Sequence, residues 1–176
     1  MKHTLAALNT CSSTVFVTVC GKFFEHSPWV AQKAAHQRPF KSLEDLYRTM
    51  CAIVSVAPKA EQLELIREHP DLVGRLAREN KLTLESGREQ AAAGLTALSP
   101  EEVAAFEKYN AAYRERFGFP FVICARENTK NAILAAFPVR LKNTADAEIA
   151  AALQEIYKIA RLRLMDAVDE NPAPSP

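Results

Sequence analysis

Apolar residues recur at helical spacing along most of the chain, and this pattern predicts a protein built from helices. After Ser42, one side of a predicted helix carries Leu43, Leu46, Tyr47, Met50, Ile53 and Val54. A stripe after Thr144 runs to about Val168 through Ile149, Leu153, Ile156, Ile159, Ala160 and Leu164. Ser99-Pro100-Glu101-Glu102 is a capping box that predicts a helix to Arg116. We therefore expect an all-α, single-domain helical bundle of about eight to nine helices.

Shorter stretches with helix-start signals predict the other helices. They are residues 4–10, a helix from Pro28 with Ser27 as its N-cap that ends before Arg38, residues 59–68, a helix from Pro70 and Asp71 through Leu72, Val73 and Leu76, a helix capped by Thr83, and a helix after Asn131 that ends at Pro138. Residues 14–20 are dense in β-branched side chains and read locally as a strand. A lone strand has nothing to pair with in such a chain, so we expect tertiary context to override this propensity.

Residues 117–125 interrupt the helical pattern. Gly118 and Pro120 prevent a regular helix, yet the run is almost wholly apolar. We expect a buried, non-helical segment whose main-chain groups need partners. A bound ligand can meet part of that need, so the segment is a candidate wall of the active-site pocket.

Length and charge limit the classes of function. A chain of 176 residues fits one domain, which we assign to residues 1–170, followed by a proline-rich disordered tail at 171–176. With 22 Lys and Arg against 21 Asp and Glu, the net charge is +1, so no overall field favours nucleic acid or an anionic membrane. No apolar run reaches the roughly 20 residues of a membrane span. We expect a small-molecule substrate or a protein partner.

The cysteines and histidines show no metal-ligand spacing. Cys11, Cys20, Cys51 and Cys124 lie far apart and form no C-x-x-C pair. We interpret the four cysteines as reduced thiols of a cytosolic protein without bound metal.

Candidate chemistry gathers between residues 67 and 90. His69 precedes Pro70, which pushes its backbone away from the helical region and holds the imidazole at a helix junction. Ser86, Glu89 and Gln90 fall at i, i+3 and i+4, on one helical face. This cluster is either a satisfied internal network, which spacing alone favours, or a ligand site in which a His beside a Glu performs acid-base chemistry. His26 reads as a bonded or exposed bystander in an aromatic stretch.

Five motifs together resemble the OHCU decarboxylase family, whose full name is 2-oxo-4-hydroxy-4-carboxy-5-ureidoimidazoline decarboxylase. They are Phe24-Glu25-His26-Ser27-Pro28-Trp29-Val30-Ala31, His69-Pro70-Asp71-Leu72, Ser86-x-x-Glu89-Gln90, Phe117-Gly118-Phe119-Pro120-Phe121-Val122-Ile123, and Lys158-Ile159-Ala160-x-Leu162-Arg163-Leu164. The resemblance covers nearly the whole chain and implies a cofactor-independent, metal-free carboxy-lyase that forms (S)-allantoin in urate degradation. It also implies an all-α homodimer, a helix at 14–20, and an internal site for a small anionic ring.

The resemblance assigns roles residue by residue. His69 matches the catalytic proton donor, and Glu89 is the expected second proton-handling group. Matches to substrate-contacting positions are Pro70, Ser86, Gly87, Arg88, Glu89, Gln90, Phe121, Val122, Ile123, Cys124, Ala125 and Arg163. Arg163 has an alternative role, pairing with Glu89. The chain ends Pro174-Ser175-Pro176 rather than in a peroxisomal tripeptide, which favours a cytoplasmic enzyme.

Two rival functions remain. One is a decarboxylase or lyase with the same scaffold that acts on another ureido or hydroxy acid. The other is a non-catalytic helical binding module, against which the presence of His69, Ser86 and Glu89 argues.

Overall fold

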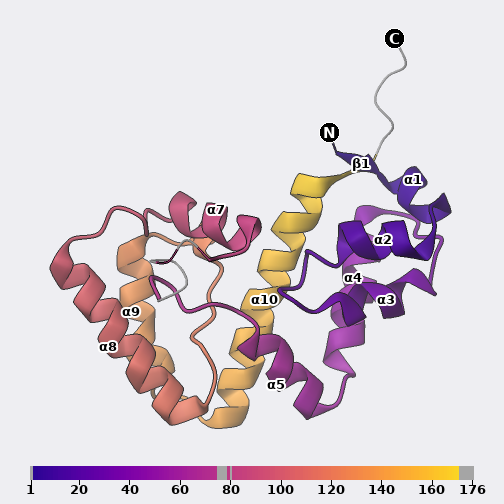
Figure 1. Cartoon of the computed structure of the whole chain (residues 1–176). Coiled ribbons are helices and arrows are strands. Elements are labelled where there is room, and N and C mark those ends of the chain that lie inside the picture. Colours follow the sequence, from indigo (N-terminus) through magenta and orange to yellow (C-terminus); the bar gives the residue numbers. More distant parts are fainter. Residues whose placement is uncertain (1, 75–78, 80, 171–176) are drawn as a thin grey trace. The chain divides into compact units, whose positions relative to one another are not determined.

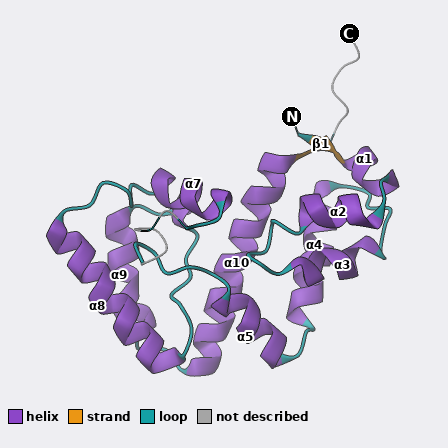
Figure 2. Ribbon diagram, in the orientation of Figure 1, coloured by secondary structure: helices purple, strands orange, loops and turns teal. Residues whose placement is uncertain are grey.

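The structure of the protein, a computed structural model, describes residues 2–74, 79 and 81–170 (Figure 1). That part of the chain contains nine α-helices, one short 3-10 helix and a pair of two-residue strands, which confirms the predicted all-α class (Figure 2). None of its helices is long and apolar enough to cross a membrane. The chain divides into two compact units, unit 1 (residues 1–65 and 157–176) and unit 2 (residues 66–156).

Unit 1 is a small helical stack. Its elements are β1 (His3–Thr4), α1 (Leu5–Thr10), α2 (Ser13–Cys20), α3 (Pro28–Ala35), α4 (Leu43–Ser55), most of α5 (Lys59–Arg67), the last part of α10 (Ala145–Ala167) and β2 (Val168–Asp169). Helix α3 packs against both α2 and α4. The two strands, which the sequence did not predict, pair in parallel with His3 opposite Val168.

Residues 14–20 are helical, as tertiary context was expected to require. The Ser12 hydroxyl caps α2 by accepting from the Val15 N–H at 3.3 Å. Phe16 and Cys20, one turn apart, are both fully buried. Burial of this face outweighs the local preference of β-branched residues for strands.

Unit 2 is built around an aromatic core. Its elements are the end of α5, α7 (Leu84–Ala92), α8 (Pro100–Phe117), η1 (Ala125–Glu127), α9 (Lys130–Arg140) and the first part of α10. Helices α8 and α9 pack together (Figure 1). Phe121, from the segment between α8 and η1, stacks on Phe137 of α9 with ring centroids 3.9 Å apart. Tyr113 of α8 contacts the Phe121 ring edge-on, with ring centroids 5.2 Å apart. The non-helical segment is thereby tied to both helices.

Local signals predicted most helix boundaries in unit 2. Ser99 and Glu102 form the predicted capping box, and Gly118 ends α8 in the left-handed region at φ +75°. The predicted end of a helix at Pro138 is wrong, because α9 continues to Arg140. A proline in the last turn forfeits a single hydrogen bond, and the side chain of Arg140 is anchored by an ion pair with Glu148.

One further prediction needs adjustment, and another is not tested. Ser27 occupies the N-cap position of α3, but its side chain makes no capping hydrogen bond. The tail predicted at 171–176 lies outside the described residues.

We expect Ser99→Ala to lower the free energy of unfolding by about 1 kcal/mol, because the hydroxyl caps α8 by accepting from the Glu102 N–H. The measurement is urea unfolding followed by circular dichroism. Ser55→Ala is the matched control, since that exposed hydroxyl bonds only to the Ala52 C=O of its own helix and its loss should cost less than about 0.5 kcal/mol. Equal losses in the two variants would mean that the cap does not stabilise α8.

Candidate active site

His69 lies in the short connection after α5. Its N–H donates to the Ile66 C=O at 3.2 Å, and only 5% of the residue is exposed. Pro70 follows and disfavours a helical backbone at His69. The imidazole is therefore buried at the end of a helix, as its position before a proline predicted.

The helix predicted from Pro70 onward is wrong for residues 71–74, which form a turn; Leu76 lies outside the described residues. Val73 has φ +55°, a left-handed conformation that costs a β-branched residue on the order of 1–3 kcal/mol. Gly74 is required by close approach, because a Cβ there would lie 2.7 Å from the Asp71 Cβ. Such a turn persists only when its surroundings fix it.

Gln90 of α7 fixes one side of this turn. Its Oε1 accepts from the Val73 N–H at 3.0 Å, and its Nε2 lies 3.5 Å from the Asp71 C=O. Gln90 is 5% exposed; its bond to Val73 is buried and its bond to Asp71 is partly buried. They fasten the segment that begins with His69 to the helix that carries Ser86 and Glu89.

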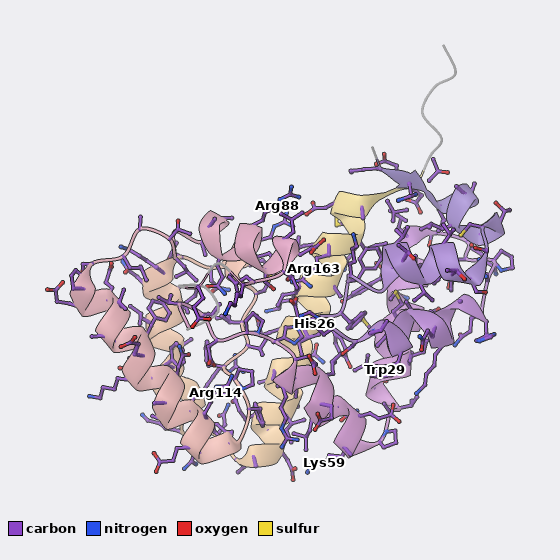
Figure 3. The ribbon with its side chains drawn as sticks, in the orientation of Figure 1. His26, Trp29, Lys59, Arg88, Arg114 and Arg163 are labelled. Atoms are coloured by element: carbon purple, nitrogen blue, oxygen red, sulfur yellow. The ribbon has the colours of Figure 1, made fainter. Side chains whose placement is uncertain are left out.

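Helix α8 fixes the other side of the turn. Asn110 Nδ2 donates to the Leu72 C=O at 2.8 Å within the core. One helical turn later, Arg114 donates from Nε to both carboxylate oxygens of Asp71, each at 2.9 Å (Figure 3). Sequence reasoning missed both residues. The available signal was a polar Asn110 at a core position between Phe106 and Tyr113.

Helix α7 presents the predicted polar face. Thr83 caps it by accepting from the Ser86 N–H at 3.2 Å, as predicted. Ser86 and Gln90 are buried and Glu89 is half-buried, whereas Arg88 is exposed (Figure 3). A hydroxyl, a carboxylate and an amide thus share one face of α7.

Residues 118–124 are non-helical and largely buried, which confirms the middle of the segment predicted at 117–125. The prediction is wrong at both ends, because Phe117 is the last residue of α8 and Ala125 is the first of η1. Phe121, Val122 and Cys124 are each at most 4% exposed, while Ile123 is half-buried. Ala125 begins η1, which packs against α7. The structure therefore brings the end of this segment to the helix that bears Glu89.

Burial raises the pKa of the Cys124 thiol to about 11, and the nearby carboxylates of Glu127, Glu155 and Glu89 contribute to the increase. A thiol with that pKa is protonated at neutral pH and is a poor nucleophile. The cysteine in this segment is thus unsuited to covalent catalysis.

Arg163 lies in unit 1, near the C-terminal end of α10 (Figure 3). It is 5% exposed and pairs with the buried Glu25 at 2.8 Å, and it donates to the Lys22 C=O at 3.2 Å. Sequence reasoning missed Glu25 as its partner, although a carboxylate after two phenylalanines was a signal. His26, next to it, is exposed, as predicted. The contact of Arg163 with substrate stays a prediction.

A pocket of about 650 Å³ lies in unit 2 against the side of α7 that carries Gly87 and Arg88. Its lining is mainly apolar and includes Val73, Gly87, Arg88 and Gln90, but neither Ser86, Glu89 nor residues 121–125. The predicted substrate contacts of α7 therefore divide between two sides of the helix. Gly87 and Arg88 line the apolar side.

Among the described residues, no group of three or more His, Cys, Asp or Glu side chains is arranged to hold a metal ion. The fold and these residues define a class: a helical protein with a buried histidine at the start of a segment that is hydrogen-bonded to a helix carrying a serine, a glutamate and a glutamine.

Comparison with known proteins makes the class specific. The OHCU decarboxylase family model matches residues 9–165, and the chain belongs to this family. It is 40% identical to the 2-oxo-4-hydroxy-4-carboxy-5-ureidoimidazoline decarboxylase of Haloferax volcanii, over 93% of this chain and 95% of that one. It is 41% identical to the uric acid degradation bifunctional protein PucL of Bacillus subtilis, over 95% of this chain but only 33% of PucL.

A solved structure has a similar fold. The crystal structure of an (S)-allantoin synthase matches with a TM-score of 0.76 and 30% identity, over 94% of this chain and 54% of that chain.

The buried Glu25–Arg163 pair allows a sharp stability test. We expect Glu25→Gln to lower the free energy of unfolding by about 3 kcal/mol, because it removes the charge of one partner from a buried ion pair. Glu61→Gln is the control: Glu61 pairs with Lys33 at 3.1 Å, but both side chains are about half exposed, so its loss should cost less than about 1 kcal/mol. Urea unfolding measures both, and similar costs would contradict a structural role for Glu25.

Proposed function

We propose that the chain decarboxylates 2-oxo-4-hydroxy-4-carboxy-5-ureidoimidazoline to (S)-allantoin, a step in urate degradation. Membership of the OHCU decarboxylase family supports this activity. The observation that carries it is the fixed position of His69, which is buried in a segment fastened by Gln90 to the helix of Ser86 and Glu89. This arrangement suits a reaction that needs one proton delivered to one face.

The substrate supplies its own electron sink. Its carboxylate is on a carbon next to a ring C=N bond, so the electrons released with carbon dioxide flow into that bond. No redox group or metal is required for this step. The protein has to orient the carboxylate across the ring plane, stabilise the enol-like species and protonate it on one face.

His69 and Glu89 perform the proton handling in this proposal. His69 acts as the proton donor, from a side chain that is itself buried. Glu89, which is half-buried, is the second proton-handling group. Proton transfer depends on the position of the donor as much as on its charge, so the residues that hold His69 in place contribute to the activity.

Substrate recognition falls to the groups around this pair. Ser86 and Gln90 bind the urea-like edges of the ring, together with main-chain groups of residues 121–125. Gln90 Oε1 already accepts one hydrogen bond, from the Val73 N–H, and a carbonyl oxygen has a second lone pair for a ligand. Arg163 offers a bidentate grip on an anion.

We further propose that residues 1–170 act as one functional domain of a cytoplasmic homodimer. The family match runs from residue 9 to 165 and so includes both compact units. Sedimentation at several concentrations would show whether two copies associate.

The activity is tested by generating the substrate in place from urate, adding the protein and following chiral allantoin by circular dichroism. We expect rapid appearance of the (S) enantiomer. If the signal grows no faster than without protein, the activity is wrong, and turnover of another ureido or hydroxy acid would favour the sister-enzyme alternative.

His69→Asn and Glu89→Gln should each lower turnover by roughly 100- to 10,000-fold, the usual contribution of a positioned acid or base. Both changes keep the shape of the side chain and remove the titrating group. The double variant should be little worse than the poorer single variant, because residues that act as one unit are strongly non-additive. Turnover is measured by the circular dichroism assay, with helical content as the folding control.

The turnover of His69→Asn tests whether His69 is the proton donor. If His69→Asn keeps more than about a tenth of wild-type turnover, which corresponds to a loss under about 1.4 kcal/mol, His69 only positions the substrate.

Activity should also survive exhaustive treatment with a chelator, since the proposed reaction needs no metal. Turnover is compared before and after dialysis against chelator. Loss of activity that a divalent ion restores would show that a metal takes part.

A further inference from the structure

The segment between α8 and η1 has irregular backbone, so side chains from elsewhere bind its main-chain groups. Arg140 of α9 donates to the Val122 C=O. Glu155 of α10, within unit 2, accepts from the Cys124 N–H at 2.8 Å. Each of the two peptide planes that flank Ile123 is therefore held by one side chain.

A trans peptide is planar, and its C=O and N–H point in opposite directions. When Arg140 binds the Val122 C=O, it also sets the direction of the Ile123 N–H. When Glu155 binds the Cys124 N–H, it likewise sets the direction of the Ile123 C=O. Within residues 2–74, 79 and 81–170, neither of these Ile123 groups makes a hydrogen bond.

Arg140 is itself rigidly held. Its Nε donates to Glu148 at 2.6 Å, and its guanidinium lies 4.4 Å from the ring centre of Phe121. Phe121 is stacked on Phe137, so the Arg140 guanidinium makes a cation–π contact with one ring of a stacked pair. The planar fork of an arginine can bind a carboxylate and a carbonyl at once, which a lysine ammonium cannot do with the same geometry.

Glu148, fully buried, completes the anchor. Besides Arg140, it accepts hydrogen bonds from the Tyr113 hydroxyl and from Asn143 Nδ2, the latter at 2.7 Å. Burial raises the pKa of Tyr113 well above its usual value, so the hydroxyl remains a donor. With three partners, the buried carboxylate is well satisfied and Arg140 has little freedom to move.

We propose that Arg140 and Glu155 are positioning residues, which turn the N–H and C=O of Ile123 toward a ligand that offers an acceptor and a donor of its own. A ureido group, with its C=O beside N–H, has this chemistry. The inference rests on the proposed function for the identity of that ligand. It adds that substrate affinity depends on two side chains that touch the peptide planes and not the substrate.

The test uses four variants. Arg140→Lys keeps a positive charge but not the fork, and Glu155→Ala removes the acceptor of the Cys124 N–H. Glu155→Gln keeps an acceptor oxygen at the same reach and is the conservative rescue. Arg48→Lys is the matched control, because Arg48 forms an exposed i, i+4 pair with Glu44 in unit 1.

We expect Arg140→Lys and Glu155→Ala each to raise KM, and the Kd for (S)-allantoin measured by calorimetry, by about tenfold, the usual effect of a misdirected hydrogen bond. The value of kcat should fall less than about threefold, since binding is lost equally in ground and transition states. Glu155→Gln should lie within about threefold of wild type, and Arg48→Lys should be unchanged. A merely structural role would change thermal unfolding without this split.

Several outcomes would overturn the inference. They are an unchanged Kd in Glu155→Ala, an equal effect of Glu155→Gln and Glu155→Ala, or no binding of (S)-allantoin to the wild-type protein. If Arg140→Lys fails to fold, the comparison of Glu155→Ala with Glu155→Gln tests the inference alone. Turnover from urate tests the proposed function and product affinity tests this inference, so the two failures are distinguishable.

Discussion

The hydrogen bond between the Val73 N–H and the side chain of Gln90 joins two segments that are 17 residues apart. Helix α7 has only nine residues, too few to be stable alone, so its position depends on such contacts. The left-handed Val73 is costly by itself and needs an acceptor placed from outside. Because Gln90 supplies that acceptor, His69 and the polar face of α7 are held in one frame before any ligand binds. The bonds from α8 to the same turn close the frame on its other side.

Both units hold irregular backbone by the same arrangement, a buried carboxylate paired with an arginine that donates to a main-chain carbonyl. In unit 2, buried Glu148 anchors Arg140, and Arg140 binds the Val122 C=O. In unit 1, buried Glu25 anchors Arg163, and Arg163 binds the Lys22 C=O. In each pair the carboxylate neutralises a charge that burial would otherwise make costly, while the broad guanidinium retains donors for a carbonyl. Loops that a small domain cannot stabilise by hydrophobic packing alone are thereby given defined conformations.

The sequence predicted what is encoded locally. Helix starts at Ser42, Thr83, Ser99 and Thr144 depend on hydrogen bonds within three residues, and the spacing of Ser86 and Gln90 depends only on helical geometry. The turn at 71–74 was missed because its partners lie on α7 and α8, far along the chain, while Pro70 locally favours a helix start. The same limit hid Glu25 and Arg140, whose roles appear only when the chain has folded. Motif resemblance, in contrast, gave the family, which the family model confirms, and the prediction that His69 and Glu89 handle protons rests on that resemblance.

Desolvation of Cys20, Cys51 and Cys124 has a consequence for the reactivity of these thiols toward oxidants. Burial raises the pKa of Cys51 and Cys124 to about 11 and that of Cys20 to about 12. At neutral pH a thiol with a pKa of about 11 is ionised in roughly one molecule in ten thousand. Peroxides and disulfides attack through the thiolate, so these side chains react slowly with oxidants. Cys124 sits in the segment that ends beside α7, where a sulfenic acid would disturb the bonds made by its own backbone. Packing around Cys124 therefore keeps its thiol protonated and out of contact with solvent.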